Sequence, residues 1–136
     1  MSAISPHAAL LYVMVVASAA DGHMADAELA AIAERVKALP AFADFDRQRL
    51  LSTAQECAAI LSEKEGLDTV LGLAREALPP ALRETAYLMA LEIVLSDGEV
   101  LLEEQRALKL QRHGLGLGLL EAAALERAAT ARYRTL

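Results

Sequence analysis

The chain has 136 residues, a formal net charge of −6 and a hydrophobic fraction of 55%. Its commonest residues are alanine and leucine, and aromatic residues make up only 4%. This composition favours helix over strand, so it excludes an all-β fold and a disordered chain. The length suits a single domain. No basic run or stripe is present, which excludes binding to a nucleic-acid backbone.

Helix start and stop signals predict seven helices in chain order. Ser5 is expected to cap the first helix, and Asp21-Gly22 ends it. Asp26 is expected to cap the second helix, which ends at Pro40. The predicted ranges are about 6–20, 26–39, 44–66, 68–78, 81–95, 102–113 and 119–133.

Two of these helices carry further expectations. The third begins near Asp44 or Asp46, either of which is a candidate cap. Gly72 weakens the fourth helix and is expected to mark a close contact between helices. Seven helices with short connections predict a single all-α domain over residues 1–136, built as a seven-helix bundle.

An uncharged stretch near the start has two interpretations. Residues 8–20 resemble the apolar region of a signal peptide. However, no Lys or Arg precedes the stretch, it is too short to span a bilayer, and a similar segment recurs later in the chain. We therefore expect a buried helix of a cytoplasmic protein that does not insert into a membrane. The single cysteine, Cys57, agrees with a reducing compartment and is expected in the core.

A helix hairpin occurs twice in the sequence. A shift of 76 residues places Asp21 on Asp97 and Glu28 on Glu104. Each copy reads as an apolar helix, Asp-Gly, five residues, Glu and an amphipathic helix. This pattern predicts an internal pseudo-two-fold repeat of the hairpin within the bundle. The copies cover about residues 10–39 and 86–113.

The repeat places two aspartates and two glutamates at equivalent positions. An aspartate at a helix C-terminus meets the negative end of the dipole, which costs roughly 0.3–1 kcal/mol. Taken one at a time, the aspartates are typical turn residues and the glutamates typical helix caps. If the two bends lie side by side, the carboxylates form a cluster that a hard cation such as Ca²⁺ or Mg²⁺ neutralises. The candidate metal ligands are Asp21, Glu28, Asp97 and Glu104, with Glu99 and Glu103 as neighbours.

In both copies the spacing from glycine to glutamate matches that of an EF-hand loop. The oxygen ligands that precede this glycine in an EF-hand are absent, since apolar residues stand in those places. We therefore expect a weak site that is shared between the loops or largely hydrated.

The two segments that carry the Asp-Gly and Glu motif, residues 19–28 and 95–104, resemble the tellurite-resistance TerB family. The resemblance extends over about residues 5–133. It implies an all-helical bundle with internal pseudo-two-fold symmetry and a non-enzymatic role in resistance to tellurite and other stresses. It also implies metal binding by the four acidic motif residues, and protein partners that include membrane-associated complexes.

The two copies differ in ways that bear on the site. Leu102 stands where the first copy has Asp26, which predicts the loss of a helix cap worth on the order of 1 kcal/mol. His23 stands where the second copy has Glu99. Both differences argue against symmetric, tight metal binding.

Two other functions are open at this stage. In one, the chain is a protein–protein interaction or homodimerisation module without a metal site. This module would use a leucine cluster, if it is exposed, made of Leu115, Leu117, Leu119 and Leu120. In the other, either the pair Glu103 and Glu104 or the whole acidic cluster supplies the acid–base groups of an enzyme. We expect no catalytic residue and no cofactor besides a divalent cation, because the sequence lacks a zinc-type histidine pair, a P-loop lysine and a dinucleotide motif.

Overall fold

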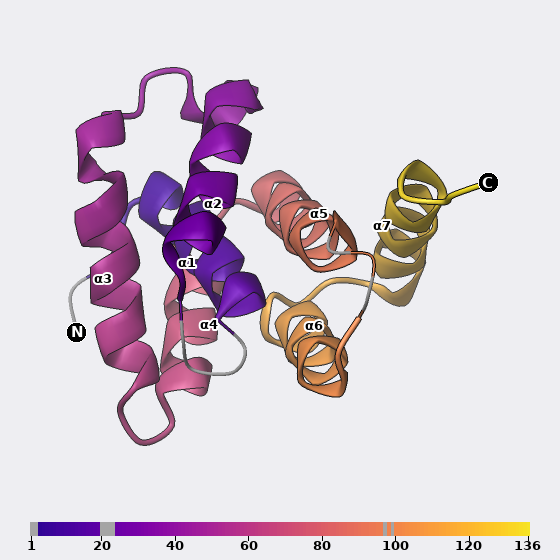
Figure 1. Ribbon diagram of the computed structural model, residues 1–136. Coiled ribbons are helices and arrows are strands. Elements are labelled where there is room, and N and C mark those ends of the chain that lie inside the picture. Colours follow the sequence, from indigo (N-terminus) through magenta and orange to yellow (C-terminus); the bar gives the residue numbers. More distant parts are fainter. Residues whose placement is uncertain (1–2, 20–23, 97, 99) are drawn as a thin grey trace.

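The computed structural model describes residues 3–19, 24–96, 98 and 100–136. Within these residues the chain forms seven α-helices and two short 3₁₀-helices, and no strand (Figure 1). The prediction of an all-α fold with seven helices is therefore confirmed. The elements are α1 (Pro6–Ser18), α2 (Asp26–Ala38), η1 (Pro40–Phe42), η2 (Arg47–Arg49), α3 (Leu50–Leu61), α4 (Gly66–Ala77), α5 (Pro80–Ser96), α6 (Leu102–Gly114) and α7 (Leu119–Arg132).

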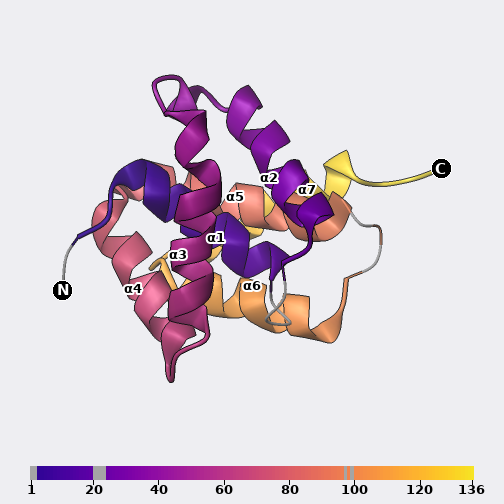
Figure 2. The same ribbon diagram turned by 60° about the vertical axis from the view of Figure 1, so that its left-hand side comes forward.

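Helix α1 is the centre of the fold. Its residues from Ala9 to Ala17 are all buried. A helix that is apolar on every side has no face to offer to water, so it must be surrounded by other elements. Helices α3, α4, α5 and α6 pack around it, and α2 covers part of what remains (Figures 1 and 2). The uncharged stretch near the start of the chain is thus the core of the domain. No helix in the described ranges combines the length and the apolar character needed to cross a bilayer.

Helix α7 lies at one edge of the molecule and packs on α5 (Figure 1). One carboxylate fixes it there. The Tyr87 hydroxyl on α5 donates to Glu126 Oε2 at 2.6 Å, and Arg112 Nη1 on α6 donates to the same oxygen at 3.2 Å. Because the Glu126 carboxylate accepts hydrogen bonds from both α5 and α6, it holds α7 in place against these two helices.

A buried amide joins α6 to α1. Gln111 is fully buried, and its Nε2 donates to the carbonyl oxygen of Val13 at 3.1 Å. Gln111 Oε1 has no hydrogen-bond partner among the described residues. Because a buried polar side chain is costly unless it is bonded, this contact favours one position of α6 against α1.

Several helix boundaries differ from those predicted. The Ser5 cap is confirmed, since its Oγ accepts from the Ala8 N–H at 3.1 Å. Asp46 caps η2 by accepting from the Gln48 N–H at 3.0 Å, so α3 itself begins four residues later. The helix also ends at Leu61, because a turn with Glu65 in the left-handed region (φ 59°) separates α3 from α4.

The prediction for Gly72 is wrong, and the described glycines that do make close contacts include Gly66 and Gly114. A Cβ built at Gly72 would meet no atom within 4 Å, and this residue is exposed. A Cβ at Gly66 would overlap the carbonyl oxygen of Ile60 at the end of α3. The chain therefore needs glycine at the start of α4 and not in its middle.

Replacing Gly72 by alanine is expected to raise the free energy of unfolding by about 0.5–1 kcal/mol, because the exchange restricts the unfolded chain at an open helix position. Gly66→Ala is expected to lower it by about 1–3 kcal/mol, since the added methyl group must displace backbone. Urea unfolding of both variants measures the difference. A stabilising effect of Gly66→Ala would contradict the close contact.

Candidate functional site

Glu28 lies in the first turn of α2 and bonds back to the start of its own helix. Its Oε1 accepts from the backbone N–H of Ala25, the N-cap residue, at 2.9 Å. The carboxylate therefore satisfies one of the N–H groups that a helix start leaves unpaired, at the end where the helix dipole favours negative charge.

Glu104 makes the same contact at the start of α6. Its Oε1 accepts from the backbone N–H of Leu101 at 2.9 Å. The glutamates of the two hairpins thus share one local geometry, in which one carboxylate oxygen is bonded to backbone. The wider pseudo-two-fold repeat stays a prediction.

The predicted difference in capping between the two copies is wrong. Asp26 is the first residue of α2 and not its cap, and Leu102 holds the same position in α6. The N-cap residues are Ala25 and Leu101, and neither has a side chain that accepts a hydrogen bond. Both helix starts depend on the returning glutamate instead, so the second copy has lost no cap.

Glu28 and Glu104 line one small cavity, although 76 positions separate them in the chain. The cavity has a volume of about 130 Å³, room for about four water molecules. Ser18 at the end of α1 and Ser96 at the end of α5 line it as well. The ends of two apolar helices and the starts of two amphipathic helices therefore meet at one place.

A positively charged side chain also lines the cavity. Arg35 on α2 lines it, and Arg35 Nε is buried without a hydrogen-bond partner among the described residues. The other side of the guanidinium is anchored, because Nη2 donates to the Tyr133 hydroxyl at 3.4 Å. The described lining thus carries two carboxylates and one guanidinium.

The other predicted ligands are not part of this described lining. Asp21, Asp97 and Glu99 lie outside the described residues. Glu103 is exposed and lines a different groove, beside Leu110 on α6. Over the described part of the chain, no three acidic, histidine or cysteine side chains gather closely enough to hold a metal ion. Glu28 and Glu104 are therefore not a metal site without further ligands.

An aromatic cluster that was not predicted from the sequence lies near the start of α1. His7 Nε2 donates to the carbonyl oxygen of Ala41 at 2.9 Å. The His7 ring stacks on Phe42 and lies edge-on to Phe45, with ring centroids 5.4 and 5.2 Å away. These are the only two phenylalanines in the sequence. The closeness of these two phenylalanines in the sequence, between the second and third helices, could have indicated an aromatic cluster. The participation of His7 could not be predicted, because His7 is far from them in the chain.

Cys57 on α3 is a core residue, as the sequence predicts. Its side chain is fully buried, and its Sγ lies 3.8 Å from the carbonyl oxygen of Tyr12. Burial raises the pKa of the Cys57 thiol to about 12. Because the thiolate is the reactive form of cysteine, this position is unsuited to nucleophilic or redox chemistry.

The fold and the paired acidic helix starts define a small, acidic, all-helical domain with two glutamate-capped hairpins meeting at a cavity. The chain belongs to the TerB family, because the family model described as tellurite resistance protein TerB matches residues 7–128. The family resemblance drawn from the sequence is thereby confirmed. No curated protein and no solved structure matches the chain.

Cys57 is expected to resist Ellman's reagent at pH 8 in the folded protein and to react fully in guanidinium chloride at the same pH. The unfolded thiol ionises near its ordinary pKa of 9.0, whereas the folded thiol ionises near 12. The contribution of Cys57 to stability is therefore present below pH 9 and is lost as the pH rises from there toward 12. Rapid labelling of the native protein would contradict the burial of this thiol.

Proposed function

We propose that this domain is a cytoplasmic, non-enzymatic member of the tellurite-resistance-associated TerB family. In this proposal it binds a divalent cation weakly, through acidic groups where its two hairpins meet, and recruits protein partners. The ligands are Asp21, Glu28, Asp97 and Glu104, and the ion is Ca²⁺ or Mg²⁺.

The observation that carries the proposal is the cavity shared by Glu28 and Glu104. Each glutamate bonds to backbone through Oε1. The second oxygen of each carboxylate stays available for a cation, which fits a hard ion with oxygen ligands. Asp21 and Asp97 precede these helices by the same number of residues, so they are the natural source of the further oxygen ligands.

The guanidinium of Arg35 explains why the site should be weak. An arginine beside two carboxylates neutralises part of their charge, so an incoming cation gains less electrostatic energy. The volume of the cavity also favours an ion that keeps water ligands, as Mg²⁺ does.

Titration calorimetry with CaCl₂ and MgCl₂ tests this site. The double variant Asp21→Asn/Asp97→Asn is expected to bind at least about tenfold more weakly than the wild type. Glu28→Gln/Glu104→Gln is expected to lose affinity while it stays folded, because glutamine keeps the capping bond and removes only the charge.

The matched control is Asp44→Asn/Asp68→Asn, which removes two exposed carboxylates outside the cavity. This variant is expected to bind like the wild type. The metal part of the proposal is wrong if the wild type shows no binding heat, or if control and site variants lose affinity equally.

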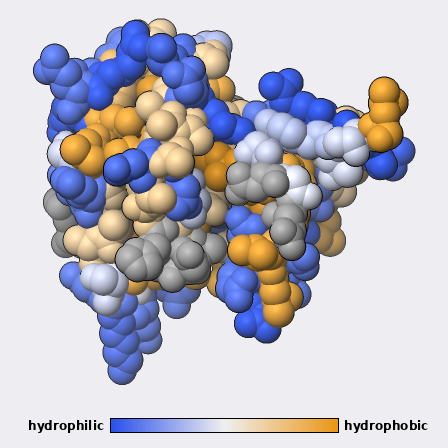
Figure 3. Space-filling view, viewed as in Figure 1, coloured by the Kyte–Doolittle hydropathy of each residue, from blue (hydrophilic) through white to orange (hydrophobic). Residues whose placement is uncertain are grey.

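The second candidate function is homodimerisation, and it has an observation of its own. Leu119 and Leu120, at the start of α7, are 82% and 79% exposed. The predicted leucine cluster is corrected in one member, since Leu115 is fully buried in the core. A second apolar patch lies at the start of α6 (Figure 3), where Leu101 and Leu102 are about half exposed.

If these leucines form a dimer interface, Leu119→Arg or Leu120→Arg is expected to convert a dimer into a monomer, because a charge in an apolar contact is costly. Sedimentation velocity at several protein concentrations measures the change. Asp21→Asn/Asp97→Asn should leave the dimer intact. A wild type that stays monomeric at high concentration contradicts the homodimer.

A further inference from the structure

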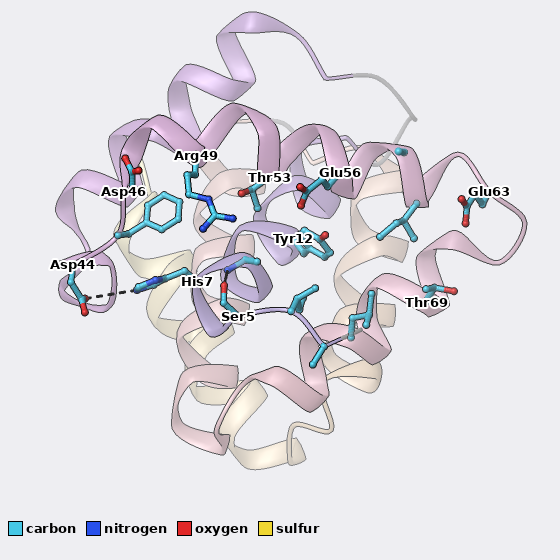
Figure 4. Close-up of a pocket in the computed structure, with 17 residues that line it drawn as sticks. Ser5, His7, Tyr12, Asp44, Asp46, Arg49, Thr53, Glu56, Glu63 and Thr69 are labelled. Carbon is cyan, nitrogen blue, oxygen red and sulfur yellow. Dashed lines mark hydrogen bonds and ion pairs between the residues drawn. The ribbon is translucent and has the colours of Figure 1, made fainter. Parts of the chain in front are cut away.

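A groove lies along α3, and it shares no lining residue with the cavity that holds Glu28 and Glu104. Its volume is about 960 Å³, at the upper end of the range of ligand pockets, roughly 300–1,000 Å³. One wall is α3. The other wall is formed by the first residues of the chain, the start of α1 and part of α4, and Tyr12 lies between the two walls (Figure 4).

The wall formed by α3 has the spacing at which one helix packs along another. Thr53, Glu56 and Ile60 line the groove at intervals of three and four residues, so they share one face of the helix. Arg49, just before α3, and Glu63, just after it, continue the same spacing. Alternating intervals of three and four residues keep a row of side chains against a second helix over several turns. The groove therefore suits an elongated, helical occupant.

The groove also has an apolar lining that the protein itself covers only in part. Ile4 and Ala8 line it from the start of the chain, Leu73 from α4 and Ile60 from α3. Phe45, from the segment between α2 and α3, lines it as well. Ile4, Ile60 and Phe45 are only partly buried. An apolar side chain placed on them would remove more of their surface from water, which is favourable.

The charged side chains of the lining are mostly acidic. Against the single guanidinium of Arg49, four exposed carboxylates line the groove, those of Asp44, Asp46, Glu56 and Glu63. Asp44 lies 4.0 Å from His7 Nε2. Glu56 and Glu63 form no ion pair with any residue that the structure describes. An excess of one charge along a groove attracts ligands of the opposite charge.

These features together narrow the choice of ligand. An anion is disfavoured by the charge of the lining. In the described part of the chain, no three acidic, histidine or cysteine side chains gather closely enough to hold a metal ion. A small hydrophilic cation would match the charge but leave the apolar lining in water. The ligand that uses both properties is basic, apolar on one face and elongated.

We propose that this groove binds an amphipathic helix of a partner protein, with an apolar face toward the groove and Lys or Arg beside that face. The inference rests on the proposed recruitment of protein partners, and it names the surface that recruits them. The apolar face packs on Ile4, Ile60 and Phe45, in the manner of other helices that bind in grooves. The basic residues pair with Glu56 and Glu63, which sets the orientation of the helix more than its affinity.

Fluorescence anisotropy of a labelled model peptide, titrated with the full chain, tests the proposal. The peptide is about 15 residues long, roughly the helix length from Arg49 to Glu63, with leucine at intervals of three and four and lysine beside it. Saturable binding with one site is expected. Glu56→Gln/Glu63→Gln is expected to weaken binding at least about fivefold, because two ion pairs are lost. Ile4→Ser is expected to weaken it by a similar factor, because apolar contact is lost.

Glu76→Gln/Glu84→Gln is the matched control, because it removes two exposed carboxylates that do not line the groove. This variant is expected to bind the peptide like the wild type. A second peptide of the same composition, with its leucines spread around the helix, is expected to bind much more weakly because it has no apolar face.

Three results would overturn the proposal. The first is the absence of saturable binding of the leucine–lysine peptide to the wild type. The second is equal weakening by the groove and control double variants, which would indicate attraction to the net charge alone. The third is equal binding of the two peptides, which would show that no apolar face is recognised.

The calcium and magnesium titrations are a separate measurement, so the two proposals can fail independently. Peptide binding without any binding heat from the metal salts would contradict the cation site alone. Binding heat without peptide binding would contradict the assignment of this groove and leave the cation site intact.

Discussion

The burial of α1 on all sides is the constraint on which the rest of the structure depends. A helix without a polar face cannot lie on a surface, so the other helices must enclose it. The ends of α1 are the only parts of it that reach the outside. Ser18 at the end of α1 lines the cavity shared by Glu28 and Glu104, and His7 at its start packs on Phe42 and Phe45.

Glu28 and Glu104 each bond to the start of their own helix, and both line one cavity. Each replaces the side-chain cap that Ala25 and Leu101 cannot provide. The same bonds hold the carboxylates in fixed orientations at the cavity, so the charge there is preorganised instead of mobile. The positively charged side chain of Arg35 lines the same cavity.

The helices could be predicted from the sequence, whereas the contacts between the helices could not. Ser5, Pro40 and the apolar run after His7 act through near neighbours, so helix number and most boundaries follow from local rules. The cap of α2 was misassigned, because Asp26 at the first helical position resembles a cap in sequence, and the cap loss predicted for α6 followed from that error.

Contacts between distant segments were beyond local rules. Thr53 and Tyr12 line one groove only because α3 packs on α1, and no spacing along the chain encodes that packing. The same holds for Arg35, whose partner Tyr133 lies 98 residues away. The turn before Gly66 was missed for a different, local reason, since Glu65 occupies a left-handed backbone position that usually holds glycine or asparagine.

The amide of Gln111 has a consequence for the geometry between the two hairpins. It stands two turns after Glu104 on α6 and is bonded to α1, the helix that leads into the other hairpin. Sliding α6 along its axis by one residue, about 1.5 Å, would move the Gln111 amide away from the Val13 carbonyl. The amide N–H would then be buried without a hydrogen bond. The Gln111 side chain, which is remote from both glutamates, thus fixes the position of α6 along its axis. It thereby helps to set the distance between Glu28 and Glu104.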